Sequence, residues 1–82
     1  MAKAFHLTIA RVGENLFDGE AESVTLPGAE GTFEVLAGHE AFVTPLHAGT
    51  ARVKAIDGEM HQFALSDGGI AEVSSNQATV LL

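Results

Sequence analysis

The sequence predicts an all-β fold, a flattened antiparallel β-sandwich or barrel of about nine to ten short strands in two sheets. Apolar residues recur at every second position, which is the period of a half-buried strand. Turn residues interrupt these runs at short intervals. No stretch of about ten or more residues carries an apolar helical face.

The alternation begins near the first residues and continues to the last. Phe5, Leu7 and Ile9 alternate with polar or small residues, and the same pattern returns around Val53 and Phe63. Because strands with one polar face favour antiparallel pairing, we expect neighbouring strands to run in opposite directions. The predicted strands are 4–10, 15–17, 20–27, 31–36, 41–47, 50–56, 60–66, 69–73 and 77–82.

Turn signals separate these predicted strands. Residues 12–15 and 17–19 break the first third of the chain. Asp57-Gly58 predicts a tight hairpin, since this dipeptide suits a turn with positive φ, and residues 74–76 predict another turn. Gly68-Gly69 is interpreted as a bulge or as the point where the chain crosses between the sheets.

The length, composition and net charge limit the classes of protein to which the chain can belong. The 82 residues are expected to form one domain, 1–82. A hydrophobic content of 46% with 18% charged residues argues against disorder. The net charge of −7 argues against nucleic acid as a partner and against an anionic membrane surface, and no apolar run is long enough for membrane insertion. The acidity serves solubility or complements a basic protein partner.

No constellation of catalytic residues is recognisable, so we expect neither an enzyme nor a bound metal or cofactor. The histidines lack metal-ligand spacing, and the chain has no cysteine. Ser66-Asp67 is too generic for a nucleophile. His39 is interpreted as shaping its loop by a hydrogen bond or as contacting a partner, and both roles can hold together. The apolar run 42–46 is either part of the core or an interface with another chain.

Several segments resemble the N-terminal β-sandwich of the ε subunit of F-type ATP synthase. They follow one another in the family's order and at matching separations, across nearly the whole chain. The segments are Phe5-His6-Leu7-Thr8-Ile9, Leu16-Phe17-Asp18-Gly19-Glu20-Ala21, Leu26-Pro27-Gly28-Ala29-Glu30-Gly31, Ala37-Gly38-His39, Thr44-Pro45-Leu46-His47-Ala48-Gly49 and Leu65-Ser66-Asp67-Gly68-Gly69-Ile70-Ala71-Glu72-Val73.

The sequence also departs from the family's pattern. Ala37 and Ala48 stand where proline is common, and Glu34 stands where glycine is common. The family normally continues into a helical hairpin that can inhibit ATP hydrolysis or bind ATP. This sequence runs to Leu82 without it, so a naturally short subunit and an isolated domain both stay open.

The resemblance implies a non-catalytic central-stalk subunit of the ATP synthase that couples proton-driven rotation to ATP synthesis. It implies contact of Arg11, His39, Phe42 and Thr44 with the γ subunit, with Arg11 near the other three. It implies that Ala29, Glu30, Gly31 and Thr32 form a loop facing the c-ring. The expected location is peripheral, at the cytoplasmic face of a bacterial plasma membrane.

Two alternatives from other classes are kept. One is a free-standing β-sandwich module that binds a peptide or a carbohydrate, and the other is a small hydrolase. The absence of tryptophan and tyrosine disfavours a sugar-binding platform, which usually needs such rings. The missing catalytic constellation disfavours the hydrolase.

Overall fold

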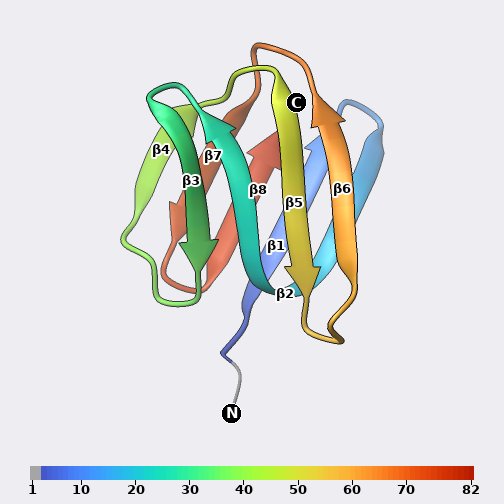
Figure 1. Ribbon diagram of the computed structural model, residues 1–82, viewed down its shortest axis with the longest axis vertical. Helices are drawn as coiled ribbons and strands as arrows, with labels where there is room; N and C mark the ends of the chain where they lie inside the picture. Colours follow the sequence, from blue (N-terminus) through green and yellow to red (C-terminus); the bar gives the residue numbers. More distant parts are fainter. Residues whose placement is uncertain (1–2) are drawn as a thin grey trace.

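The computed structural model describes residues 3–82, so Met1 and Ala2 of the predicted domain lie outside the described residues. This part of the chain contains no helix, and the predicted all-β class is confirmed. Its eight strands are β1 (Phe5–Arg11), β2 (Glu14–Gly28), β3 (Gly31–Leu36), β4 (Phe42–Pro45), β5 (Gly49–Ala55), β6 (Met60–Leu65), β7 (Ile70–Ser74) and β8 (Gln77–Leu81) (Figure 1).

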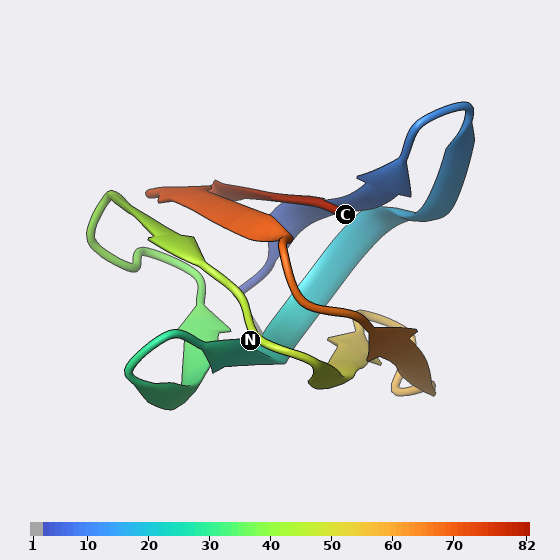
Figure 2. The same cartoon turned by 90° about the horizontal axis from the view of Figure 1, so that it is seen from above.

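The strands form two layers made from one continuous sheet. Their order is β4-β7-β8-β1-β2-β5-β6, and β3 pairs with β2. Figure 2 shows β4, β7, β8 and β1 in one layer and β3, β5 and β6 in the other, while β2 passes from the first layer to the second. The predicted sandwich is therefore present, but its two faces belong to a single folded sheet rather than to two separate sheets.

The predicted strand count is wrong because residues 15–17 and 20–27 belong to one strand, β2. Asp18 and Gly19 do not turn the chain, since both stay paired with β1, opposite Thr8 and Leu7. The actual turn lies earlier, at Val12 and Gly13. A register shift between Ala21 and Ser23 in the β2–β5 ladder marks where the long strand bends toward the other layer.

The purely antiparallel arrangement is also wrong at one place. β1 and β8 run parallel, with His6 opposite Gln77 and Ala10 opposite Leu81, whereas all other strand pairs are antiparallel. Parallel neighbours need a long crossover connection, and β2 to β7 supply it here. Alternation alone could not reveal this pairing, because it reports which side of a strand is buried and not which strand lies beside it.

The core lies between the two layers and is entirely apolar in the part of the chain that the structure describes. Each strand contributes its inward-facing residues, as the alternation predicted. Full burial of one such side chain contributes about 1.5–3 kcal/mol to stability. The largest fully buried side chains are Phe5, Leu7, Ile9, Leu26, Val24, Val35, Val53 and Val80.

Three predicted connections are confirmed. Asp57-Gly58 turns the chain between β5 and β6, and residues 74–76 turn it between β7 and β8. The segment with Gly68-Gly69 joins β6 in one layer to β7 in the other (Figure 2), so it is the crossing between layers.

Candidate functional site

The loop predicted to face the c-ring is the turn of the β2–β3 hairpin. The ladder runs up to Gly28 opposite Gly31, which leaves Ala29 and Glu30 at the tip. These two residues, Gly31 and Thr32 are all exposed. A Cβ atom at Gly28 would lie 2.7 Å from the Phe33 ring and 2.9 Å from the Gly31 carbonyl, so the close approach of these groups requires glycine there.

His39 lies in the corner between β3 and β4. Gly38 takes a φ of 81°, and its N–H donates to the Ser75 carbonyl at 2.7 Å. The His39 N–H donates to the Leu36 carbonyl at 3.2 Å, and Nδ1 lies 3.0 Å from the Glu40 carbonyl, which accepts in the tautomer protonated at Nδ1. The loop-shaping role predicted for His39 is confirmed.

Aromatic rings connect this corner to the hairpin. The His39 ring centroid lies 5.0 Å from that of Phe42, and Phe42 meets Phe33 edge-on at 5.3 Å. The rings stand beside an open groove of about 490 Å³. Residues of both predicted sets line the groove: Glu30, Gly31, Thr32, His39, Phe42 and Thr44. The structure thus joins two sets that the sequence analysis treated as separate contacts.

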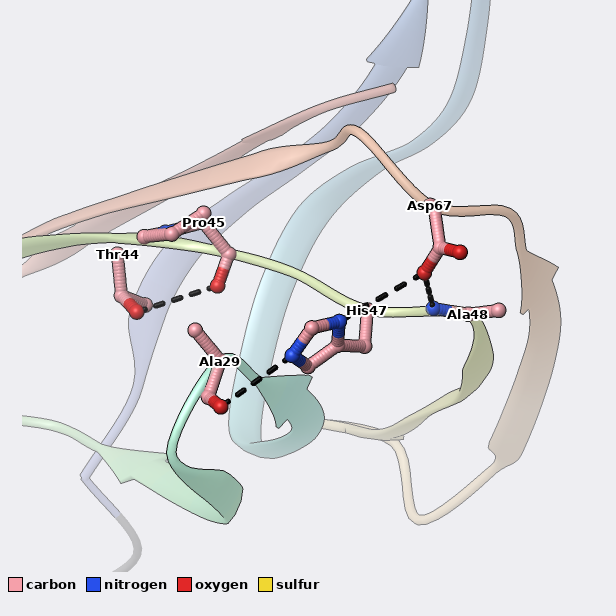
Figure 3. Close-up of polar contacts among 6 residues, drawn as sticks. All are labelled: Ala29, Thr44, Pro45, His47, Ala48 and Asp67. Carbon is pink, nitrogen blue, oxygen red and sulfur yellow. Dashed lines mark hydrogen bonds and ion pairs between the residues drawn. The ribbon is translucent and has the colours of Figure 1, made fainter.

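His47 ties the hairpin tip to the rest of the molecule (Figure 3). Its Nε2 lies 3.3 Å from the Ala29 carbonyl, and its Nδ1 lies 3.7 Å from Oδ1 of Asp67. The same Asp67 oxygen accepts the Ala48 N–H at 2.7 Å, and the Ala29 N–H donates to the Pro45 carbonyl at 3.0 Å. The segment 45–47 therefore holds the tip directly, and Asp67 holds that segment in turn.

No individual role was predicted for His47 from the sequence, so this contact was missed. The partner Ala29 lies 18 positions away, and it takes part through its backbone carbonyl. No local sequence pattern predicts a contact between a side chain and a backbone carbonyl so distant in the chain. The one available signal was the position of His47 directly after the apolar run 42–46.

Arg11 does not lie near His39, Phe42 and Thr44, so this part of the prediction is wrong. It ends β1, which is separated from β4 by β8 and β7. Three strand spacings amount to roughly 15 Å. The Arg11 Nε lies 3.8 Å from Oε1 of Glu14 across the hairpin turn.

A row of apolar side chains runs across the surface of this layer, from β4 over β7 and β8 to the end of β1 beside Arg11. Consecutive ladders pair Pro45 with Ile70, Ile70 with Leu81, and Leu81 with Ala10. Ile70 and Leu81 are 40% and 52% exposed, and Val43 beside them is 59% exposed. We call Val43, Pro45, Ile70, Leu81 and Ala10 the apolar band.

The core interpretation of the run 42–46 is confirmed for Leu46, and the interface interpretation stays a prediction for the exposed residues. Leu46 is buried in the core, whereas Val43 points outward and belongs to the apolar band. Burial alternates along the run, but the apolar/polar pattern does not, because the exposed positions Val43 and Pro45 are apolar as well.

Another set of polar contacts links side chains of β1 and β2. His6 lies between two carboxylates, with Nε2 2.6 Å from Asp18 and Nδ1 3.4 Å from Glu20. Within residues 3–82, no group of three or more histidine or acidic side chains is arranged to hold a metal ion.

The fold and these surfaces define a class: a small β-sandwich whose distinctive features are an exposed apolar band and an anchored loop, as in domains that bind other proteins. The family can also be stated. Residues 4–82 match the model of the ATP synthase Delta/Epsilon chain β-sandwich domain, and the chain belongs to this family. The resemblance noted in the sequence is therefore confirmed.

Individual relatives agree with this assignment. The chain is 36% identical over 81 residues to the ATP synthase epsilon chain of Janthinobacterium sp. (strain Marseille), covering 99% of this chain and 58% of that relative. It is 37% identical over 79 residues to the ATP synthase epsilon chain of Chlorobium limicola, covering 96% of this chain and 89% of that relative. The chain thus spans little more than half of the Janthinobacterium protein.

A solved structure has the same fold. It is a chain in the cryo-EM structure of the Euglena gracilis mitochondrial ATP synthase, comprising OSCP, F1 and c-ring. The TM-score is 0.87 at 30% sequence identity, and the match covers 95% of this chain and 49% of the other.

Proposed function

We propose that this chain acts as the β-sandwich domain of a central-stalk subunit of an ATP synthase, as a single domain over residues 1–82 that docks on the γ subunit and the c-ring. In this role it couples proton-driven rotation to ATP synthesis and has no active site of its own. The proposal is supported by relatives named ATP synthase epsilon chain and by a similar chain in an ATP synthase assembly that includes a c-ring.

The observation that carries the proposal is the apolar band. Leaving a row of apolar side chains in water does not stabilise a small domain, and such a row is typical of an interface with another protein. The band begins beside Thr44 on β4 and ends beside Arg11 on β1. Its side chains point outward from the layer, whereas Phe42 and Thr44 alternate with Val43 and Pro45 on β4 and point toward the other layer. The band therefore adds an outward apolar surface next to the groove, and it runs along the layer from β4 to the end of β1.

The hairpin tip is the surface that we assign to the c-ring. Ala29, Glu30, Gly31 and Thr32 project from the sandwich, and the Glu30 carboxylate favours a basic loop on the partner. Because this tip and the β3–β4 corner line the same groove, the two partners would meet there. A basic side chain of a partner could extend its apolar stem over the aromatic rings and reach the carboxylate.

The anchoring of the tip supports a mechanical role. A loop that transmits torque must not yield under load, and this one is held by the Pro45 carbonyl and by His47. The close-packed core behind it resists compression. In this role the domain turns as a rigid body with the stalk.

We place the chain at the cytoplasmic face of a bacterial plasma membrane, peripheral to it and held there through the complex. No helix within residues 3–82 has the length and apolar character needed to span a bilayer. The net charge of −7 favours protein partners over an anionic lipid surface.

Rebinding to membranes tests the proposal. Membranes carrying an ATP synthase stripped of its own ε subunit are incubated with the 82-residue chain, with Ile70→Asp, and with Thr79→Asp as a matched control. Thr79 lies on the neighbouring strand of the same layer, outside the apolar band. We expect the unmodified chain and Thr79→Asp to bind, and Ile70→Asp to bind at least about tenfold more weakly, because a charge is forced against an apolar partner surface. Equal binding of all three would remove the apolar band as the docking face, and no binding of any would overturn the function.

A further inference from the structure

β6 forms a free edge at the opposite end of the strand order from β4, and it pairs with β5 alone. The Ala55 N–H donates to the Glu59 carbonyl at 2.9 Å, which identifies Ala55 and Glu59 as a hydrogen-bonded pair. Such pairs alternate along an antiparallel ladder. Met60, Gln62 and Ala64 therefore direct their N–H and C=O groups away from β5, toward the outside of the sheet.

This edge lacks the features that usually protect a free strand. β6 reads Met60-His61-Gln62-Phe63-Ala64-Leu65, with neither a charged residue nor a proline, and its ladder with β5 has no register shift. The other two free edges differ. β3 carries Glu34, and β4 is four residues long and ends in Pro45. Among the strands of residues 3–82, β6 is thus the edge most open to an added strand.

Half-buried aromatic rings lie directly beside this edge. The Phe17 ring of β2 stands 5.3 Å from His61 and 6.4 Å from Phe63, in both cases tilted edge-on. The inward side chains of a strand added to β6 would cover these rings. Burial of partly exposed aromatic surface favours such an addition.

The charges at the two ends of β6 distinguish between two possible binding partners for this edge, a second copy of the chain and a strand with basic ends. β6 is neutral, but Asp57 and Glu59 precede it and Asp67 follows it. In an antiparallel pairing of two copies about the centre of β6, Glu59 of one copy would approach the Asp67 end of the other, which is unfavourable. Lysine or arginine at both ends of an incoming strand would instead meet opposite charges.

We propose that the β6 edge binds an extended segment of a partner protein as an additional strand, with an uncharged, alternating centre and basic residues at both ends. Main-chain hydrogen bonds to Met60, Gln62 and Ala64 supply the ladder, and the flanking acids select the ends. This site is distinct from the apolar band and from the groove. It predicts a second interaction that leaves the γ- and c-ring-facing surfaces free.

Titration with a synthetic peptide tests this site. The ¹⁵N-labelled 82-residue chain is titrated with the peptide Lys-Lys-Thr-Val-Thr-Val-Thr-Val-Lys-Lys, and amide shifts and hydrogen exchange are followed. We expect new protection at the amides of Met60, Gln62 and Ala64. A peptide with glutamate in place of the four lysines should bind at least about tenfold more weakly.

A pair of variants tests whether the main-chain ladder is needed. Gln62→Pro deletes an outward N–H that β5 does not use, and edge strands tolerate proline in this position. It should bind the basic peptide at least about tenfold more weakly, while Gln62→Thr, which keeps the N–H, should bind like the unmodified chain. A peptide N-methylated at alternate residues gives the same loss without altering the protein, so the result does not depend on the folding of Gln62→Pro.

Each other outcome overturns the site. Amide shifts confined to the groove would move binding away from β6. Equal affinity for lysine- and glutamate-flanked peptides would remove the charge selection. Protection of the β6 amides without peptide, rising with protein concentration, would identify a second copy as the occupant.

Discussion

The two edges of the sandwich contain the same kinds of side chain, a histidine beside two phenylalanines, yet they differ in how the backbone is used. At the groove edge, His39 and Phe42 pack beside Phe33, and the surrounding loops are bound to other segments through backbone groups. At the β6 edge, His61 and Phe63 pack with Phe17, and the outer backbone groups of the strand face solvent. The same kinds of side chain thus occur at both edges. We call the groove edge the closed edge because its loops are anchored, although β3 and β4 each pair with one strand only, and we call the β6 edge the open edge. The hydrogen bonding of the backbone, rather than the aromatic content, distinguishes an anchored contact surface from an edge able to accept a strand.

The largest loss of stability at the closed edge is expected when a side chain is placed at Gly28. Gly28→Ala places a Cβ within 2.7 Å of the Phe33 ring and 2.9 Å of a carbonyl, and we expect a loss of about 2–3 kcal/mol in the free energy of unfolding. Urea denaturation followed by circular dichroism measures it. Gly19→Ala is the matched control, because its nearest contact would be 3.8 Å, and it should change stability by less than about 0.5 kcal/mol. Equal effects of the two substitutions would contradict the close packing at the hairpin.

A pair of aromatic truncations separates stability from binding. Phe42→Ala and Phe63→Ala each remove a half-buried ring, so we expect both to lower the free energy of unfolding by about 2 kcal/mol. Only Phe42→Ala should weaken rebinding to ATP synthase membranes, since Phe63 lies at the other edge. If Phe63→Ala weakens rebinding as much as Phe42→Ala, the assignment of γ contact to the groove edge is wrong.

The polar anchor of the closed edge has a smaller expected effect. Asp67→Ala removes the acceptor of the Ala48 N–H and the carboxylate beside His47, and exposure of these groups limits the loss to about 0.5–1 kcal/mol. Hydrogen exchange should show faster exchange of the Ala48 amide. Asp57→Ala, which removes the acceptor of the Glu59 N–H in the β5–β6 turn, serves as the control at the open edge. Exchange of Ala48 that stays unchanged in Asp67→Ala would contradict the anchor.

The smallest effect on stability is expected at the hairpin tip. Glu30→Lys changes an exposed charge and should alter the free energy of unfolding by less than about 0.5 kcal/mol. It should nevertheless weaken the coupling of proton pumping to ATP hydrolysis, because a basic tip would repel a basic loop of the c-ring. Proton pumping and circular dichroism measured together check this, with Glu59→Lys at the open edge as control. Unchanged coupling in Glu30→Lys would remove the tip from the c-ring interface.

Much of the fold could be predicted from the sequence because strand period and tight turns are local properties. The alternation of Phe5, Leu7 and Ile9 placed these side chains in the core, and Asp57-Gly58 marked its hairpin. The prediction of a turn at Asp18-Gly19 was wrong, since a turn dipeptide can also lie within a strand when a neighbouring strand, here β1, pairs with it. Tertiary pairing overrode the local preference there.

The candidate site was less predictable because its geometry depends on strand order. Resemblance to a family indicated the hairpin tip and the β3–β4 corner, but not that they share one groove. Arg11 was misplaced because two strands from the end of the chain, β7 and β8, lie between it and β4. The contact of His47 with a backbone carbonyl leaves no trace in side-chain pattern.

The parallel pairing of β1 with β8 has a consequence for the time course of folding. β1 can pair with β8 only after residues 77–81 have been synthesised, and a further bond joins the Leu82 N–H to the Ala10 carbonyl at 2.9 Å. One layer therefore cannot close until β8 has been synthesised. Contacts between residues so distant in sequence slow folding, and they leave the half of β1 facing β8 exposed in the nascent chain.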